Sequence, residues 1–275
     1  MKYSKLMTAL LAASVLAACG NKEESKQPEE QPVEEQEVIV DVKQQAESFK
    51  TYAQAQMDGF VADTERLASL VKEGKLEDAQ KLYPLVTMYY ERLQPLTANF
   101  AALDEKINGP LIEGKEEEIT GFQRLAQGLF INKTTSGYDV VVDQLVTDVK
   151  QLQQDVEGLD VSQNNVLASA VSMFEQMANE RLTTTSMANN EVYAVKAQTE
   201  VAEELVEIFM QRVSTDSAAA ATEKIAALNE IVAYYEVGKE DYVNYSFFTA
   251  KQKEELKTAV VDVQNALQAM NESLK

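Results

Sequence analysis

Apolar residues recur every three or four positions along most of the chain. The clearest stretch has its apolar side chains at Leu256, Val260, Val263, Leu267, Met270 and Leu274. This spacing places them on one face of a helix, and similar stripes run through 49–71, 142–159 and 192–213. No stretch alternates apolar and polar residues with the period of two that a half-buried strand requires. The pattern therefore predicts an all-α fold without a sheet.

Helix-breaking residues indicate where these helices should end. Three glycines should each end a helix, Gly74 the first, Gly158 another and Gly238 the one before the last, and Pro84 and Pro95 fall within 76–100. The two prolines interrupt an otherwise helical stretch, which should kink or break there. Thr249 followed by Gln252 is the sequence of a capping box at the start of the last helix. Because every stripe stops at a clear break, short antiparallel bundles are favoured over a long coiled coil.

Residues 1–18 have the sequence of an export signal. Two lysines precede an apolar stretch at 6–18 that is too short to span a bilayer. The stretch ends in Leu-Ala-Ala-Cys19, which resembles the lipobox of bacterial lipoproteins and implies that Cys19 is acylated and becomes the first mature residue. We therefore expect a protein of the cell envelope, anchored to a membrane by lipid and facing outside the cytoplasm. The alternative is an ordinary signal peptide with an incidental cysteine.

Residues 19–40 are predicted to be a lipidated cysteine followed by a disordered acidic linker. Its segment 21–37 holds seven glutamates and two prolines and offers almost no apolar surface to bury. Residues 41–275 are predicted to form the folded helical domain. The whole chain has a formal net charge of −20, which makes nucleic acid a poor partner and cations or basic surfaces better ones. The acidity also fits a simpler role in keeping an exported protein soluble.

The residues missing from the sequence restrict its chemistry. The chain contains no histidine, which excludes histidine-based triads, helical zinc sites of the H-E-x-x-H type and imidazole acid–base catalysis. Cys19 is the only cysteine, so a disulfide within the chain is excluded as well. The remaining carboxylates and tyrosines suit hard cations such as Ca²⁺ or ferric iron better than Zn²⁺ or Cu²⁺. We do not expect an enzyme.

The segment 83–95, Tyr-Pro-Leu-Val-Thr-Met-Tyr-Tyr-Glu-Arg-Leu-Gln-Pro, resembles a motif of a known family. It is similar to the H-Y-E-R-I-E-P helix in the imelysin-like domain of the EfeO/EfeM iron-uptake lipoproteins. Further similar segments, in the same order, are 49–52, 60–64, 103–104, 120–125 and 134–137. The resemblance extends from about residue 41 to the C-terminus. It implies two packed antiparallel four-helix bundles.

The sequence departs from the family pattern at the residues that carry its chemistry. Tyr89 stands where the family has the histidine before Y-E-R, and Gln94 replaces the acid of I-E-P. The family's proposed metal-binding signature H-R-L-E is Gln123-Arg-Leu-Ala126 here, so the resemblance implies a degenerate site at Gln123 and Ala126. A later family stretch rich in acids corresponds to 183–190, which is neutral in this chain.

Three hypotheses follow from these departures. The first is an accessory or substrate-binding component of an iron or cation uptake system with a degenerate metal site, for which the resemblance implies an iron permease and a haem-peroxidase-like protein as partners. The second is a rebuilt oxygen-ligand site for ferric iron or calcium on Glu91, Asp104 and Glu175, with Tyr89 in place of an imidazole. The third is a surface module that binds a polysaccharide or another protein. A metallopeptidase activity is not supported, because the chain has no histidines.

Overall fold

The computed structural model describes residues 41–275, which form one compact unit. The predicted signal peptide at 1–18, the predicted lipidation at Cys19 and the predicted linker up to residue 40 lie outside the described residues. No helix within 41–275 combines the length and the apolar character that a membrane span requires.

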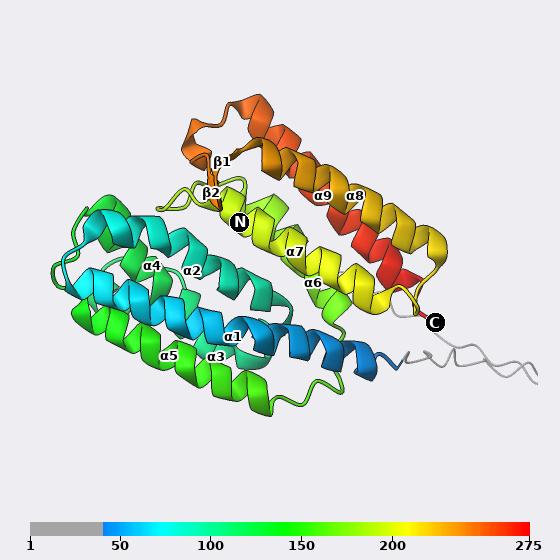
Figure 1. Cartoon of the computed structure of the whole chain (residues 1–275), viewed down its shortest axis with the longest axis horizontal. Helices are drawn as coiled ribbons and strands as arrows, with labels where there is room; N and C mark the ends of the chain where they lie inside the picture. The colour runs from blue at the N-terminus through cyan, green and yellow to red at the C-terminus, as the bar shows by residue number, and fades with distance from the viewer. Residues whose placement is uncertain (1–40) are drawn as a thin grey trace, which may run out of the picture. The chain divides into compact units, whose positions relative to one another are not determined.

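The first helix bundle is formed by the N-terminal half of this unit (Figure 1). Its helices are α1 (Lys43–Lys72), α2 (Leu76–Thr97), α3 (Ala101–Asn108), α4 (Gly121–Ala126) and α5 (Asp139–Gly158). Helix α1 packs against both α2 and α5, and the short helices α3 and α4 pack against α5. The apolar stripe of α1 faces inward, where Phe49 and Phe60 are fully buried.

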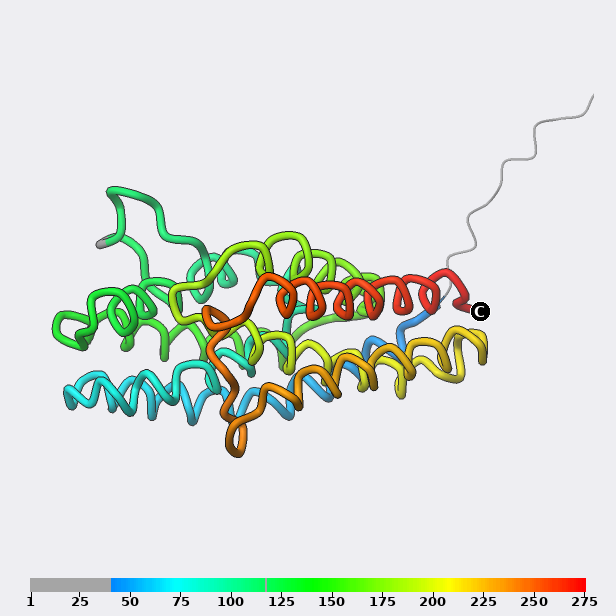
Figure 2. Tube along the Cα trace, turned by 90° about the horizontal axis from the view of Figure 1, so that it is seen from above, coloured from blue at the N-terminus to red at the C-terminus, as the bar shows by residue number. Residues whose placement is uncertain are grey.

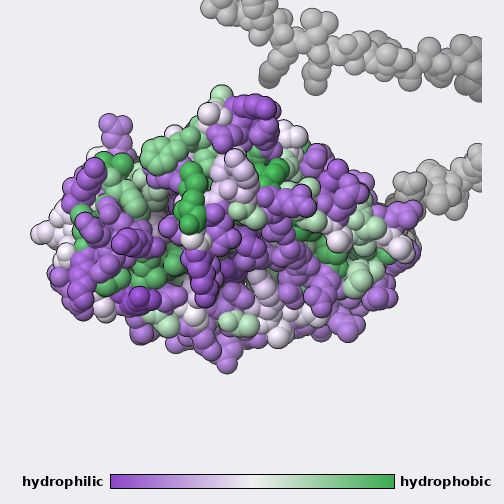
Figure 3. Space-filling model, turned by 45° about the horizontal axis from the view of Figure 1, so that its top comes forward, coloured by the Kyte–Doolittle hydropathy of each residue, from purple (hydrophilic) through white to green (hydrophobic). Residues whose placement is uncertain are grey.

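The second bundle follows with α6 (Val166–Gln176), α7 (Glu191–Phe209), α8 (Thr215–Tyr234) and α9 (Ala250–Glu272). Helix α8 packs against α7 and α9, and α9 packs against α6. Helix α2 of the first bundle packs against α6 and α7 of the second, so the two bundles share one hydrophobic core. The all-α prediction is confirmed. The face shown in Figure 3 is largely hydrophilic, with apolar residues in separate small patches.

Most of the predicted helix ends are found in the structure. Gly74 follows α1 in a left-handed conformation with φ 75°, and Gly158 is the last residue of α5. The predicted capping box of Thr249 and Gln252 is present at the start of α9. The prolines do not break α2, which contains both Pro84 and Pro95. Helices α4 and α6 each continue into a π-helical turn, at Gln127–Ile131 and Met177–Arg181.

The prediction of a fold without any sheet is wrong at one place. Strands β1 (Glu236–Gly238) and β2 (Asp241–Tyr242) pair antiparallel in the connection that crosses from α8 to α9 (Figure 2). The buried Tyr242 ring packs edge-on against Tyr193 of α7, with ring centroids 5.0 Å apart, and its backbone N–H donates to the Tyr193 hydroxyl. Strands of two and three residues are too short to produce an alternating pattern. Gly238, which was predicted to end a helix, lies in this hairpin instead, because α8 already ends at Tyr234.

Candidate ligand-binding cavity

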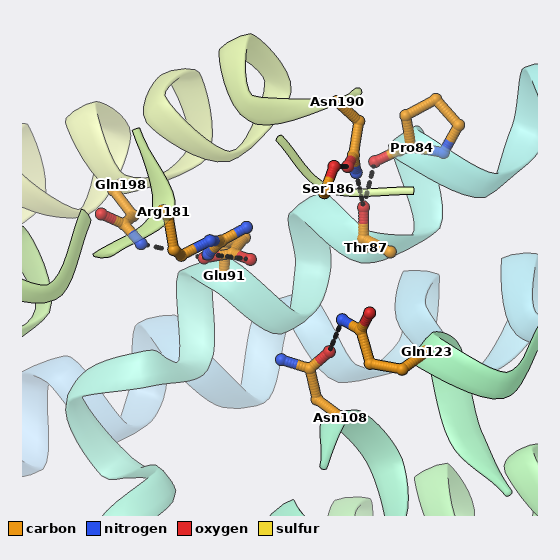
Figure 4. A network of polar contacts seen from close by, with 9 residues as sticks. All are labelled: Pro84, Thr87, Glu91, Asn108, Gln123, Arg181, Ser186, Asn190 and Gln198. Atoms are coloured by element: carbon orange, nitrogen blue, oxygen red, sulfur yellow. Dashed lines mark hydrogen bonds and ion pairs between the residues drawn. The ribbon is translucent and has the colours of Figure 1, made fainter. Parts of the chain in front are cut away.

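A cavity of about 860 Å³ lies between the two bundles, where α2 and α3 face α6 and the start of α7. Helix α2 contributes residues three or four positions apart, among them Thr87, Glu91 and Gln94, because this spacing puts them on one helical face. The loop before α7 contributes Ser186 and Asn190. The side-chain amide of Asn190 donates to the Thr87 hydroxyl, which itself donates to the carbonyl of Pro84 (Figure 4).

Glu91 is the centre of a buried polar network that joins the two bundles. Its carboxylate oxygens lie 2.6 and 2.7 Å from Nη1 of Arg181, which projects from the π-helical turn after α6 (Figure 4). The amide nitrogen of Gln198 on α7 donates to the same carboxylate over 2.9 Å. Burial by itself would lower the pKa of Arg181, but the carboxylate of Glu91 raises it above its ordinary value. The guanidinium therefore stays charged and already neutralises Glu91.

Glu191, the first residue of α7, is a second buried carboxylate in the cavity wall. Its Oε1 accepts from the backbone N–H of Ser186, and burial raises the pKa of its carboxyl group above the ordinary value of 4.5. Sequence reasoning missed Glu191 and Gln198. The signal that could have indicated them is positional, because both are polar residues, seven positions apart, on a helix whose buried face is otherwise mostly apolar.

Three buried polar atoms of the cavity wall have no hydrogen-bond partner among residues 41–275. They are the Tyr90 hydroxyl, Oε1 of Gln198 and Oε2 of Glu191, and each of these side chains belongs to a residue that is 2% exposed. Buried polar groups in folded proteins are nearly always hydrogen-bonded, because desolvation without a partner costs about 1–3 kcal/mol. All three atoms belong to residues that line the cavity.

The structure brings only some of the predicted site residues together. Glu91 and Asp104 line the cavity, as do Gln123 and Ala126 of the predicted degenerate site. Burial raises the pKa of Asp104. The amide of Gln123 donates to Oδ1 of Asn108 over 3.2 Å, and this pair adds no charge to the wall (Figure 4).

The other two predicted ligands lie outside the cavity wall. Glu175 is exposed on α6. Tyr89 lines a separate hollow beside Arg92, and its hydroxyl donates to Asp63 over 3.3 Å. Burial, and then the Asp63 carboxylate, raise the pKa of Tyr89. Within residues 41–275 no three acidic, cysteine or histidine residues lie close enough together to hold a metal ion.

Comparison with known proteins finds relatives that share one family name. No family model matches the sequence. An Efem/EfeO family lipoprotein of Staphylococcus haemolyticus is 28% identical over 97% of this chain and 98% of its own length. This chain is a homologue of the EfeO/EfeM lipoproteins.

Two further relatives of this EfeO/EfeM homologue are named for iron uptake. The iron uptake system component EfeM of Pseudomonas syringae is 25% identical over 80% of this chain and 79% of its own length. The iron uptake system component EfeO of Escherichia coli is 26% identical over 76% of this chain. The aligned part spans 58% of that EfeO protein, a little over half of its length. These relatives are named as lipoproteins or uptake components, not as enzymes.

Proposed function

We propose that this EfeO/EfeM homologue is a lipid-anchored accessory or substrate-binding component of an iron or cation uptake system. The observation that carries the proposal is the similarity to EfeO/EfeM proteins over nearly the whole chain, together with a cavity at the positions of the family motifs. Glu91 comes from the Y-E-R segment, and Gln123 and Ala126 come from the segment that matches H-R-L-E. All three line the cavity.

The proposed metal site is degenerate for an electrostatic reason. The Arg181 guanidinium is a cation built into the chain, and it satisfies both oxygens of Glu91. A bare metal ion at Glu91 would have to displace this partly buried partner, at a cost that the Glu91 carboxylate by itself does not offset. The hypothesis of a rebuilt site on Glu91, Asp104, Glu175 and Tyr89 stays a prediction. It requires that ferric or calcium ions raise the melting temperature and that Glu91→Gln abolishes the rise.

The proposed partners are an iron permease and a haem-peroxidase-like protein of the same envelope. Anchoring through Cys19 would hold the protein on the outer side of the membrane, where such a permease takes up its substrate. A second candidate function is a surface module for a non-metal ligand. The neutral amides and hydroxyls of the cavity wall, among them Gln94, Asn108 and Thr87, favour it, because they suit an organic ligand better than a bare ion.

Uptake of radioactive iron in cells that lack the gene tests the proposal. We expect uptake under iron limitation to fall and to be restored by the wild-type gene. The Cys19→Ala variant should leave the membrane fraction and fail to restore uptake, because two acyl chains give stable anchoring and this variant carries none. Ser25→Ala, in the same predicted linker, is the matched control and should restore it. Unchanged uptake in the deletion strain would overturn the uptake role in favour of the surface module.

A further inference from the structure

We infer that the cavity between the bundles binds an organic ligand that carries amino groups, held as ammonium cations against Glu191 and Gln198 of α7. The inference rests on the proposed function only in taking this cavity as the ligand site. It adds the chemical class of an organic ligand, whereas the names of the relatives mention only iron.

The size of the cavity favours an organic molecule. A volume of about 860 Å³ lies in the range of small-molecule sites, roughly 300–1,000 Å³, and is far larger than a bare ion needs. The acidic residues of its wall do not form a metal-binding group, and Glu91 is already neutralised by Arg181. The ligand is therefore large enough to fill much of the cavity, and it carries hydrogen-bonding groups of its own.

The charge of the wall favours a cation. Five acidic residues and one arginine line the cavity; they are Glu91, Asp104, Glu105, Glu180, Glu191 and Arg181. After the ion pair between Glu91 and Arg181 is set aside, only acids remain. An anionic ligand would be repelled by this wall, whereas a positively charged one is attracted to it.

The orphaned atoms favour a ligand that donates hydrogen bonds. Oε2 of an ionised Glu191 and Oε1 of Gln198 only accept hydrogen bonds, and an ammonium group offers three donors and no acceptor. The two residues stand seven positions apart on α7, two helical turns, which corresponds to about 10.5 Å along the helix axis. The Tyr90 hydroxyl, on α2, is a third unpartnered group that belongs to a residue of the cavity wall. An extended ligand with two amino groups a similar distance apart would donate to both acceptors on α7.

Two sources can supply this chemistry, a free diamine or polyamine and an iron chelate with a free amino group. Calorimetry on the mature lipoprotein in detergent distinguishes them. One arm uses 1,5-diaminopentane and spermidine. The other uses ferrioxamine B, a linear ferric chelate with a terminal amine, and its N-acetylated form, which lacks the charge. We expect saturable binding in at least one arm, and binding in either arm supports the inference.

Three variants locate the binding. Glu191→Gln should weaken it about tenfold or more, because the ammonium group loses a charged hydrogen-bond acceptor. Tyr90→Phe should weaken it without lowering the melting temperature, since it removes a hydroxyl that has no partner among the described residues. Glu207→Gln, an exposed acid on the same helix, is the matched control and should bind as the wild type does.

The inference is overturned if no probe binds. It is also overturned if N-acetylation leaves the affinity unchanged for the chelate or if both Glu191→Gln and Tyr90→Phe bind like the wild type. A melting curve of Glu191→Gln shows whether that variant folds, and Tyr90→Phe carries the test if it does not. A deletion strain with impaired iron uptake and a protein that binds no amine would leave the proposed function standing and remove only this inference.

Discussion

At the scale of single residues, Glu91 and Glu191 show two different environments for a buried carboxylate in one cavity. Glu91 accepts from Arg181 and Gln198, so its charge is fully compensated inside the protein. Oε1 of Glu191 accepts from the backbone N–H of Ser186, and Oε2 has no partner among the described residues. The first carboxylate therefore stabilises the contact between the bundles, whereas ionisation of the second costs free energy until a ligand donates to it.

The pH dependence of stability should report on Glu191. Because burial raises its pKa, the folded state holds this proton more tightly than the unfolded state does. The resulting stability is present below about pH 4.5 and is lost as the pH rises through the raised pKa. Glu191→Gln stays neutral, so the wild type should lose stability relative to it over this interval. Urea denaturation of both proteins between about pH 4.5 and 7.5 measures the difference, and a difference that is constant with pH would contradict the prediction.

At the scale of elements, a single glycine sets how closely α4 approaches α3. Gly121 begins α4 with φ 84°, and a Cβ atom there would lie 2.3 Å from the carbonyl oxygen of Lys106 near the end of α3. Only glycine combines this conformation with this contact. The close approach brings Gln123 to Asn108 and so forms one wall of the cavity.

Two glycine substitutions separate the effect of a left-handed backbone conformation from the effect of the close contact with α3. Gly74 also has a left-handed conformation, with φ 75°, but a Cβ atom added there would meet no other atom within 4 Å. Gly74→Ala should therefore lower the free energy of unfolding by only about 1 kcal/mol. Gly121→Ala adds a clash with backbone atoms, and we expect a loss of about 3 kcal/mol. Urea denaturation measures both variants, and equal losses would show that the contact with α3 is unimportant.

At the scale of the whole molecule, the two bundles are joined by apolar packing of α2 on α6 and α7 and by the ion pair of Glu91 with Arg181. The Glu91 side chain is 5% exposed and that of Arg181 33% exposed. Removal of one partner leaves the other charge partly buried and uncompensated, whereas removal of both does not. The pair therefore contributes to the mutual position of the bundles, and with it to the shape of the cavity.

A double-mutant cycle tests this coupling. Glu91→Gln and Arg181→Met should each lower the free energy of unfolding by about 2–4 kcal/mol, and the double variant should lose clearly less than the sum. The exposed pair of Lys251 and Glu255 on α9 is the control, with an expected coupling of about 0.5 kcal/mol or less. If the two cycles gave the same coupling, the ion pair between the bundles would have no special role.

The helices and several of their ends could be predicted from the sequence because they depend on local interactions. The spacing of apolar residues reports a helical face directly. Gly74 and the capping box of Thr249 and Gln252 act within a few residues of their own positions. The family resemblance singled out six residues, of which Glu91, Asp104, Gln123 and Ala126 line one cavity, whereas Glu175 and Tyr89 do not. A ligand role for any of them stays a prediction.

Only the tertiary structure decided what those residues do. Arg181 is 90 positions from Glu91, and no local pattern in the sequence indicates that its guanidinium compensates this carboxylate. Helix α2 passes through Pro84 because its buried face packs against three other helices, which outweighs a local preference to break. The partners of a buried charge are determined by which helices pack together. Local sequence determines where the helices lie along the chain, and the packing between them determines which polar groups are compensated and which are left to a ligand.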